Sequence, residues 1–171
     1  MSTNPVPVEP ETAAEATFET QPDWRLAGFL PYQLSIASNA VSSLIAERYR
    51  KRFGLKVMEW RVMAVLGDGA NAACTQQALT RITLMDKVAV NRACKVLEER
   101  GLIQRVPNER DGRSHLLELT GDGRAIHAEV MPLALATERE LFEGFAPDER
   151  AAFREFLGRM HKRAAGLATG D

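Results

Sequence analysis

The chain has 171 residues, of which 45% are hydrophobic and 26% are charged, values that are ordinary for a globular protein. No apolar run approaches the roughly 20 residues that span a bilayer, and the N-terminus lacks the basic start and apolar core of a secretory signal. The two cysteines, Cys74 and Cys94, are too far apart for a CxxC motif. We therefore expect a cytoplasmic protein without membrane contact, with one domain or one domain and an extension.

The net charge of −1 conceals an uneven distribution of charge along the chain. Residues 1–23 contain five acidic and no basic side chains, and residues 116–171 contain ten acidic and seven basic ones. Residues 75–115 contain eight basic and five acidic side chains. A basic middle between acidic ends indicates local contact with a polyanion.

Apolar residues recur at helical spacing over most of the chain after residue 28. The spacing predicts helices over residues 31–53, 58–66, 76–82, 86–100 and 120–144, and a last helix that begins at Pro147. Residues 1–28, rich in Pro, Glu, Thr and Ala, are instead expected to form an acidic, disordered arm.

Residues that favour helix ends occur at these boundaries. Thr75 and Thr120 can accept hydrogen bonds from the first turns of the helices that follow them. Gly101, followed by Leu102, matches a glycine C-cap with its hydrophobic partner. Pro132 lies inside the fifth helix and is expected to kink it or to mark a local irregularity.

Two strand-sized apolar runs, 103–106 and 116–119, flank the sequence Asn-Glu-Arg-Asp-Gly-Arg-Ser. Asp-Gly between such runs predicts a β-hairpin, because glycine tolerates the positive φ of tight turns. The tip then carries Arg110 and Arg113 around Asp111, which is placed to hold Arg113 by a charge-assisted hydrogen bond. Taken by itself, this segment favours an ordinary solvated turn, so the elements that precede it must decide.

Three helices followed by a two-stranded hairpin are the order of a winged helix-turn-helix, in a chain that is otherwise mainly α. In such a module one helix lies across the DNA backbone, the next enters the major groove, and the hairpin, or wing, lies beside it. The predicted DNA contacts are Thr75, Gln76, Lys87, Val88, Asn91, Arg92, Lys95, Arg110, Asp111 and Arg113. Lys and Arg suit phosphate or guanine, and Asn suits adenine. The alternative for the Lys87–Lys95 face is a solvated helix surface.

At these residues the chain resembles the MarR family of bacterial transcription regulators, over about residues 30–165. The resemblance is carried by three segments: Met85-Asp86-Lys87 leading to Asn91-Arg92, Leu97-Glu98-Glu99-Arg100-Gly101-Leu102, and Asp111-Gly112-Arg113 leading to Leu119-Thr120-Gly121-Asp122-Gly123. It implies a homodimer that binds a pseudo-palindromic double-stranded DNA operator, most often as a repressor. The implied organisation is a first dimerisation helix at 29–56, a DNA-binding module at 57–119 and C-terminal dimerisation helices at 120–171.

The chain departs from the family pattern at two places. Val88-Ala89 replaces the Ser-Thr that often follows the recognition-helix lysine, so hydroxyl contacts are lost there. Ala146 occupies the position where a Ser or Thr cap usually begins the last helix, which weakens the start of that helix.

A second basic cluster, with six basic and two acidic residues, lies at 44–61. One interpretation is a solvated helix end. Phe29-Leu30-Pro31-Tyr32 and Met85-Asp86-Lys87-Val88-Ala89-Val90 also resemble the family's subgroup that controls hydroxycinnamate breakdown, which implies a hydroxycinnamoyl-CoA effector such as feruloyl-CoA or p-coumaroyl-CoA. The candidate ligand residues are Leu30, Tyr32, Ser38, Trp60 and Met63 for the aromatic ring, and Arg48, Arg50, Lys51 and Arg52 for the phosphates.

Other chemistry has little support in the sequence. His115, His127 and His161 have no metal-ligand spacing, and no nucleophile–base set or phosphate loop occurs, so neither an enzyme nor a resident cofactor or metal is expected. Cys94 lies on the predicted recognition helix and leaves a redox-responsive regulator as one alternative. The other alternative is a winged-helix assembly module that does not bind specific DNA, which should expose an apolar patch on the same face.

Overall fold

The computed structural model describes residues 25–109 and 111–170, in a chain that divides into two compact units, 1–37 and 38–171. In the first unit the described residues form a short 3-10 helix, η1 (Leu26–Gly28), and the beginning of α1 (Leu30–Phe53). The predicted arm lies outside the described residues from position 1 to 24.

The second unit contains the end of α1 and all later elements. These are α2 (Val57–Gly67), the 3-10 helix η2 (Gly69–Asn71), β1 (Ala73–Cys74), α3 (Gln76–Thr83), α4 (Lys87–Glu99), β2 (Ile103–Pro107), β3 (His115–Leu119), α5 (Gly121–Leu141) and α6 (Pro147–Thr169). The predicted mainly α fold with a winged helix-turn-helix is therefore confirmed. α5 remains one helix through Pro132. None of the helices in the described part of the chain has the length and apolar character needed to cross a bilayer.

The helices that form the DNA-binding module begin and end at local sequence signals. The Thr75 Oγ1 accepts the N–H of Ala78 at 3.1 Å, and the Asp86 carboxylate accepts that of Ala89 at 2.8 Å. At the end of α4, Gly101 has φ +67°, and the Leu102 N–H returns to the Leu97 carbonyl at 2.9 Å. This is the predicted glycine C-cap, and it turns the chain directly into β2.

The core of the second unit is built around α2, which contacts α3, α4 and α5. Its fully buried large side chains are Tyr49, Leu55, Val62, Met63, Leu79, Val90, Cys94, Leu97, Leu117, Val130 and Thr137. α4 contributes Val90, Cys94 and Leu97 to this core, so its opposite face is held toward solvent by packing.

The sheet has three antiparallel strands in the order β1-β3-β2, which corrects the prediction of a two-stranded hairpin. Ala73 and Cys74 pair with Glu118 and Leu117 on the free edge of β3. A strand of two residues has no detectable alternation in the sequence, and it forms only because the chain brings an edge of β3 beside it.

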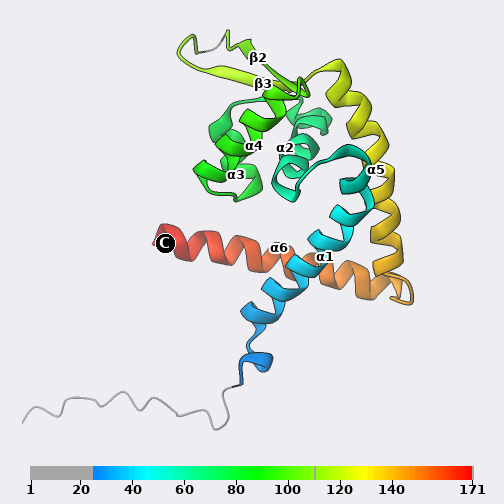
Figure 1. Cartoon of the computed structure of the whole chain (residues 1–171). Helices are drawn as coiled ribbons and strands as arrows, with labels where there is room; N and C mark the ends of the chain where they lie inside the picture. The colour runs from blue at the N-terminus through cyan, green and yellow to red at the C-terminus, as the bar shows by residue number, and fades with distance from the viewer. Residues whose placement is uncertain (1–24, 110, 171) are drawn as a thin grey trace, which may run out of the picture. The chain divides into compact units, whose positions relative to one another are not determined.

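The loop of the β2–β3 hairpin differs from the predicted tight turn. The strands end at Pro107 and restart at His115, and Gly112 is not among the described glycines with positive φ. Successive turns close the loop instead, with Asp111 N–H bonded to the Asn108 carbonyl at 3.1 Å and Ser114 N–H to the Asp111 carbonyl at 3.0 Å. Figure 1 shows the hairpin projecting beyond the α2–α4 cluster.

Candidate nucleic-acid interface

The solvent face of α4 carries a polar stripe headed by one apolar residue. Val88, Asn91, Arg92 and Lys95 are all exposed and are spaced by three or four residues, so they lie on one side of the helix. Lys87, four residues before Asn91, extends from the same end of the helix. α4 therefore presents side chains that can bind phosphate and base edges, as predicted.

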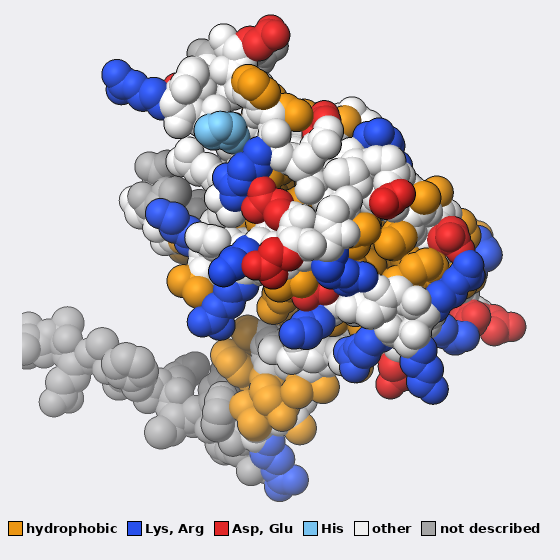
Figure 2. All heavy atoms as spheres, turned by 45° about the horizontal axis from the view of Figure 1, so that its top comes forward, with side chains coloured by type: hydrophobic (Ala, Val, Ile, Leu, Met, Phe, Trp, Pro, Cys, Tyr) orange, Lys and Arg blue, Asp and Glu red, His pale blue; other side chains and the backbone are white. Residues whose placement is uncertain are grey.

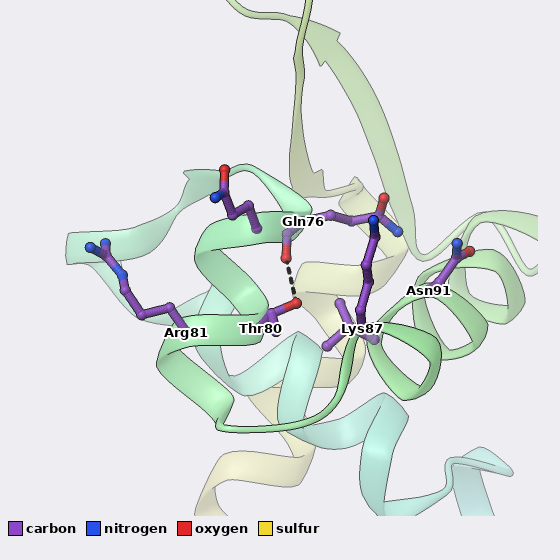
Figure 3. Close-up of a pocket in the computed structure, with 7 residues that line it drawn as sticks. Gln76, Thr80, Arg81, Lys87 and Asn91 are labelled. Atoms are coloured by element: carbon purple, nitrogen blue, oxygen red, sulfur yellow. Dashed lines mark hydrogen bonds between the residues drawn. The ribbon is translucent and has the colours of Figure 1, made fainter. Parts of the chain in front are cut away.

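A groove of about 610 Å³ separates this face from α3 and is lined by Gln76, Gln77, Thr80, Arg81, Lys87, Val90 and Asn91. Figure 3 shows Lys87 reaching toward Gln76 at the start of α3, while Arg81 extends away from Lys87 and Asn91. Thr80 donates its hydroxyl to the Gln76 carbonyl at 3.0 Å, which holds the first turn of α3. The two helices thus present amide and ammonium groups to a common space.

A second hollow, of about 390 Å³, lies between the start of α3 and the wing, which we define as residues 103–119. Its lining is mostly polar: Thr75, Gln76, Gln77, Arg105, Asn108, Asp111, Arg113, Ser114, His115 and Leu117. Gln76 lines both spaces, so the two hollows adjoin and connect α3 with α4 and with the wing. The predicted contacts Val88, Arg92 and Lys95 line neither hollow and lie on the exposed face of α4. Arg110 lies outside the described residues.

The cations of this surface divide into free and paired side chains. Within residues 25–109 and 111–170, Arg81, Lys87, Arg92 and Arg113 make no ion pair. Arg105, in contrast, donates to both carboxylate oxygens of Glu98, at 2.5 and 3.1 Å, which raises the pKa of Arg105. Lys95 lies 3.9 Å from Glu99, a distance at which an exposed pair contributes little. On the face that Figure 2 draws, basic side chains are interspersed with acidic and apolar ones and do not form one continuous patch.

The contact between Asp111 and Arg113 is made by the main chain. The Asp111 carboxylate accepts the backbone N–H of Arg113 at 3.1 Å, which corrects the prediction that it holds the guanidinium group. This bond shapes the loop and leaves the exposed guanidinium group to contact other molecules.

Several residues of this surface were not singled out from the sequence. Gln77, Thr80 and Arg81 line the first groove, and Asn108 and Ser114 line the second. Arg81 could have been identified from the sequence, because it is one of the basic residues of the stretch 75–115. The others are ordinary polar residues that become relevant only through the packing of α3 against α4 and the wing.

Arg100 anchors the end of α4 to two other helices. Its guanidinium group donates to the Phe53 carbonyl at 2.6 Å and the Gly54 carbonyl at 3.3 Å, at the end of α1. It also lies 3.8 Å from the buried carboxylate of Glu59, which accepts the Lys56 N–H at the start of α2. The orientation of α4 is therefore coupled to the ends of α1 and α2.

Both cysteines are free and buried. Burial raises the pKa of the Cys94 thiol to about 11 and also raises that of Cys74. Since the thiolate is the reactive form, these environments favour structural thiols and disfavour the redox alternative.

The candidate ligand residues are distributed over both units. Leu30 and Tyr32 are exposed in the first unit, and Ser38 is exposed at the start of the second. Met63 is fully buried, and Trp60, only 8% exposed, stacks on His127 with ring centroids 5.5 Å apart. Burial of the imidazole lowers the pKa of His127.

Two of the four candidate phosphate-binding cations are already paired with α5. Arg48 donates to Glu140 at 2.6 Å, and Arg52 pairs with Glu129. Arg50 and Lys51 are exposed and make no ion pair with any residue that the structure describes. The predicted cluster therefore offers two free cations rather than four.

Comparison with known proteins identifies similar chains. A family model described as the MarR family matches residues 53–114. The HTH-type transcriptional regulator PecS of Dickeya dadantii (strain 3937) is 27% identical over 112 residues, which are 65% of this chain and 68% of PecS. The crystal structure of the MarR family transcriptional regulator SPO1453 from Silicibacter pomeroyi DSS-3 has a TM-score of 0.67 and 30% identity, covering 81% of this chain and 99% of that one. For the MarR/EmrR family transcriptional regulator from Acinetobacter sp. ADP1 the TM-score is 0.76 at 25% identity, covering 83% and 99%.

Proposed function

Because the chain belongs to the MarR family of transcriptional regulators, we propose that it acts in the cytoplasm as a ligand-responsive repressor that binds a pseudo-palindromic operator as a homodimer. The observation that carries this proposal is the common surface of α3, α4 and the wing, with four cations that have no acidic partner in the described part of the chain. Unpaired cations are suited to phosphates, and the exposed Asn91 is suited to a base edge.

In the proposed complex α4 enters the major groove and α3 crosses the backbone. The N-terminal residues of a recognition helix lie nearest the bases, which places Lys87, Val88 and Asn91 there. Arg113 on the wing then contacts phosphate, sugar or the minor groove beside the helix. Lys87, Val88 and Asn91 thus contact base edges, while Arg113 contacts the DNA beside them, so recognition depends on the helix and the wing together.

The test of this function is selection of bound duplexes from a random pool. The expected product is an inverted repeat whose half-sites are centred about one DNA turn, roughly 34 Å, apart. Enrichment of no sequence at all would support the alternative of an assembly module, while a single unrepeated site would contradict the two-fold arrangement.

Two single substitutions separate the roles of wing and helix. We expect Arg113→Ala to weaken binding to all duplexes alike and to flatten the salt dependence, because backbone contacts are independent of sequence. We expect Asn91→Ala to relax the preference at particular base pairs, by about 1–3 kcal/mol for each lost pairing. The measurement is binding to a panel of single-mismatch operators, and identical selectivity profiles for the two variants would contradict the assignment.

Apolar side chains that a single chain leaves exposed support the homodimer. α6 buries none of its described side chains, although Phe153, Phe156, Leu157 and Met160 form an apolar face on it. Phe156 is 60% exposed. The start of this helix is stabilised despite Ala146, because the Ala146 N–H donates to the Glu149 carboxylate at 2.8 Å. A well-formed helix with an uncovered aromatic face is typical of an interface between subunits.

We expect light scattering at micromolar concentration to give twice the 18.9 kDa chain mass. Phe156→Glu should lower the mass toward that of one chain, because it places a charge in the proposed apolar interface. Lys162→Glu, at an exposed position on the opposite side of the same helix, is the matched control. A wild-type monomer at this concentration would contradict the proposal.

The proposed effector is a hydroxycinnamoyl-CoA thioester, with feruloyl-CoA or p-coumaroyl-CoA as the two candidates. The support is the basic cluster at the end of α1, where Arg50 and Lys51 are free to bind phosphate. A free aromatic acid carries one negative charge and would leave one of these two cations without a ligand group. The ligand must bind the DNA-released state more tightly than the DNA-competent state, and a tenfold preference corresponds to about 1.4 kcal/mol per site.

We expect the thioesters, but not the free acids, to release the protein from its operator in a DNA-release titration. The double variant Arg50→Ala/Lys51→Ala should bind the operator normally and lose this response. Equal potency of acid and thioester, or no response to either, would contradict the CoA effector and leave operator binding unaffected.

A further inference from the structure

The head of the α4 stripe is a valine that the fold does not require. Val88 is 59% exposed, whereas the core residues of α4 lie on the opposite side of the helix. Its stripe neighbours Asn91 and Arg92 are polar and are three and four residues further along. Valine is also a weaker helix former than alanine, so neither packing nor local preference explains it.

The geometry points to a specific ligand group for this side chain. We propose that Val88 contacts the C5-methyl group of a thymine in each operator half-site, and so makes the protein selective for thymine at that position; the inference rests on the proposed function. The C5-methyl is the apolar group that a base pair presents in the major groove, and Val88 is in the first turn of the helix assigned to that groove.

The side chain is suited to this contact because its conformation is already restricted. A β-branched residue in a helix has one strongly preferred χ1 rotamer, so little side-chain entropy is lost when it packs against a methyl group. Asn91 lies one turn further along the same stripe and can pair with adenine, so the two residues read nearby base pairs by different chemistry.

Two other exposed apolar residues, Ile82 and Leu84, lie at the end of α3 and in the turn before α4. If these three residues formed an apolar patch that binds another protein, Val88 would have no special role in DNA binding. Substitution of Val88 and of Leu84 would then have the same effect on operator affinity. Leu84 provides a control, because it has φ +53° and is 69% exposed. Leu84→Asn removes the apolar side chain and keeps a residue that tolerates this left-handed conformation.

The experiment replaces thymine by uracil, which removes only the C5-methyl group, at each symmetric pair of positions in the selected operator. Affinities are measured by fluorescence anisotropy for the wild type, Val88→Ala and Leu84→Asn. Burial of one methyl group corresponds to about fourfold in affinity, so we expect one thymine pair at which uracil weakens wild-type binding about fourfold per half-site. In Val88→Ala this penalty should fall below twofold, and in Leu84→Asn it should persist.

The outcomes distinguish this inference from the function on which it rests. A sequence-specific operator with no uracil-sensitive thymine overturns the role of Val88 and leaves the regulator intact. A uracil penalty that survives in Val88→Ala, or disappears in Leu84→Asn, assigns the contact to another side chain and also overturns it. If no duplex is selected, the proposed function fails and this inference fails with it. Thermal melting of both variants checks that they fold.

Discussion

Gly123→Ala should destabilise the protein by about 3 kcal/mol, because the added Cβ meets a main-chain atom that is not free to move. A Cβ at position 123 would lie 1.9 Å from the Leu102 carbonyl oxygen and 3.3 Å from the Leu119 side chain. That carbonyl already accepts the Thr120 N–H at 3.0 Å, and the Thr120 hydroxyl donates to the Gly101 carbonyl at 2.6 Å. The beginning of α5 is thus bonded directly to the turn that ends α4.

The measurement is denaturant unfolding, with Gly121→Ala as the matched control. Gly121 belongs to the same first turn, and a Cβ there meets no atom within 4 Å. Alanine is the better helix former, so this variant should be neutral or slightly more stable. Similar free energies of unfolding for the two variants would show that the close packing of α5 against Leu102 does not exclude a side chain at position 123.

Lys87→Ala/Arg92→Ala should weaken operator binding by about 100-fold or more at moderate salt, since each subunit of the dimer loses two contacts. Both side chains are exposed on α4 and pair with no carboxylate that the structure describes. Each phosphate contact that is lost lowers the slope of log K against log salt by roughly 0.9, so the two Arg92 contacts of the dimer account for about 1.8 and phosphate contacts by Lys87 would raise this to about 3.6. The measurement is a salt titration of operator affinity.

A control with the same change in net charge is available outside the DNA-binding module. Arg139 and Arg154 are exposed on α5 and α6 and make no ion pair within the described residues. Arg139→Ala/Arg154→Ala should therefore change the salt slope very little. An equal loss in both double variants would indicate that overall charge, rather than the α4 face, controls binding.

The helices and their ends could be predicted because their signals are local. Thr75 caps the helix that follows it. The N–H groups of Gly101 and Leu102 end α4 by donating to the carbonyls of Glu98 and Leu97, three and five positions back. Such contacts depend only on nearby residues and the 3.6-residue period. The prediction of a tight turn at Asp111-Gly112 was wrong. The loop is longer and is closed by hydrogen bonds at Asn108 and Ser114, so Gly112 does not need a positive φ.

The residues assigned to the interface remain a prediction, and their ion pairs could not be predicted from the sequence. A count of basic residues in the sequence does not distinguish Arg105 from Arg113. In the structure Arg105 forms an ion pair with Glu98, whereas Arg113 pairs with no described carboxylate. In the same way Arg48 and Arg52, two of the four cations predicted to bind a ligand, form ion pairs with Glu140 and Glu129. These partners are 7 to 92 residues away along the chain, so no spacing rule identifies them.

The sequence alone was sufficient for the order of α1 to α6 and the β2–β3 hairpin, for the winged helix-turn-helix and for the residues of α4 that face solvent, because all three follow from short-range periodicity. Only the tertiary structure decided that Ala73–Cys74 is a strand, that Arg100 joins α4 to α1 and α2, and that Gly123 admits no side chain. Each of these depends on segments distant in the sequence that come within a few ångströms of one another.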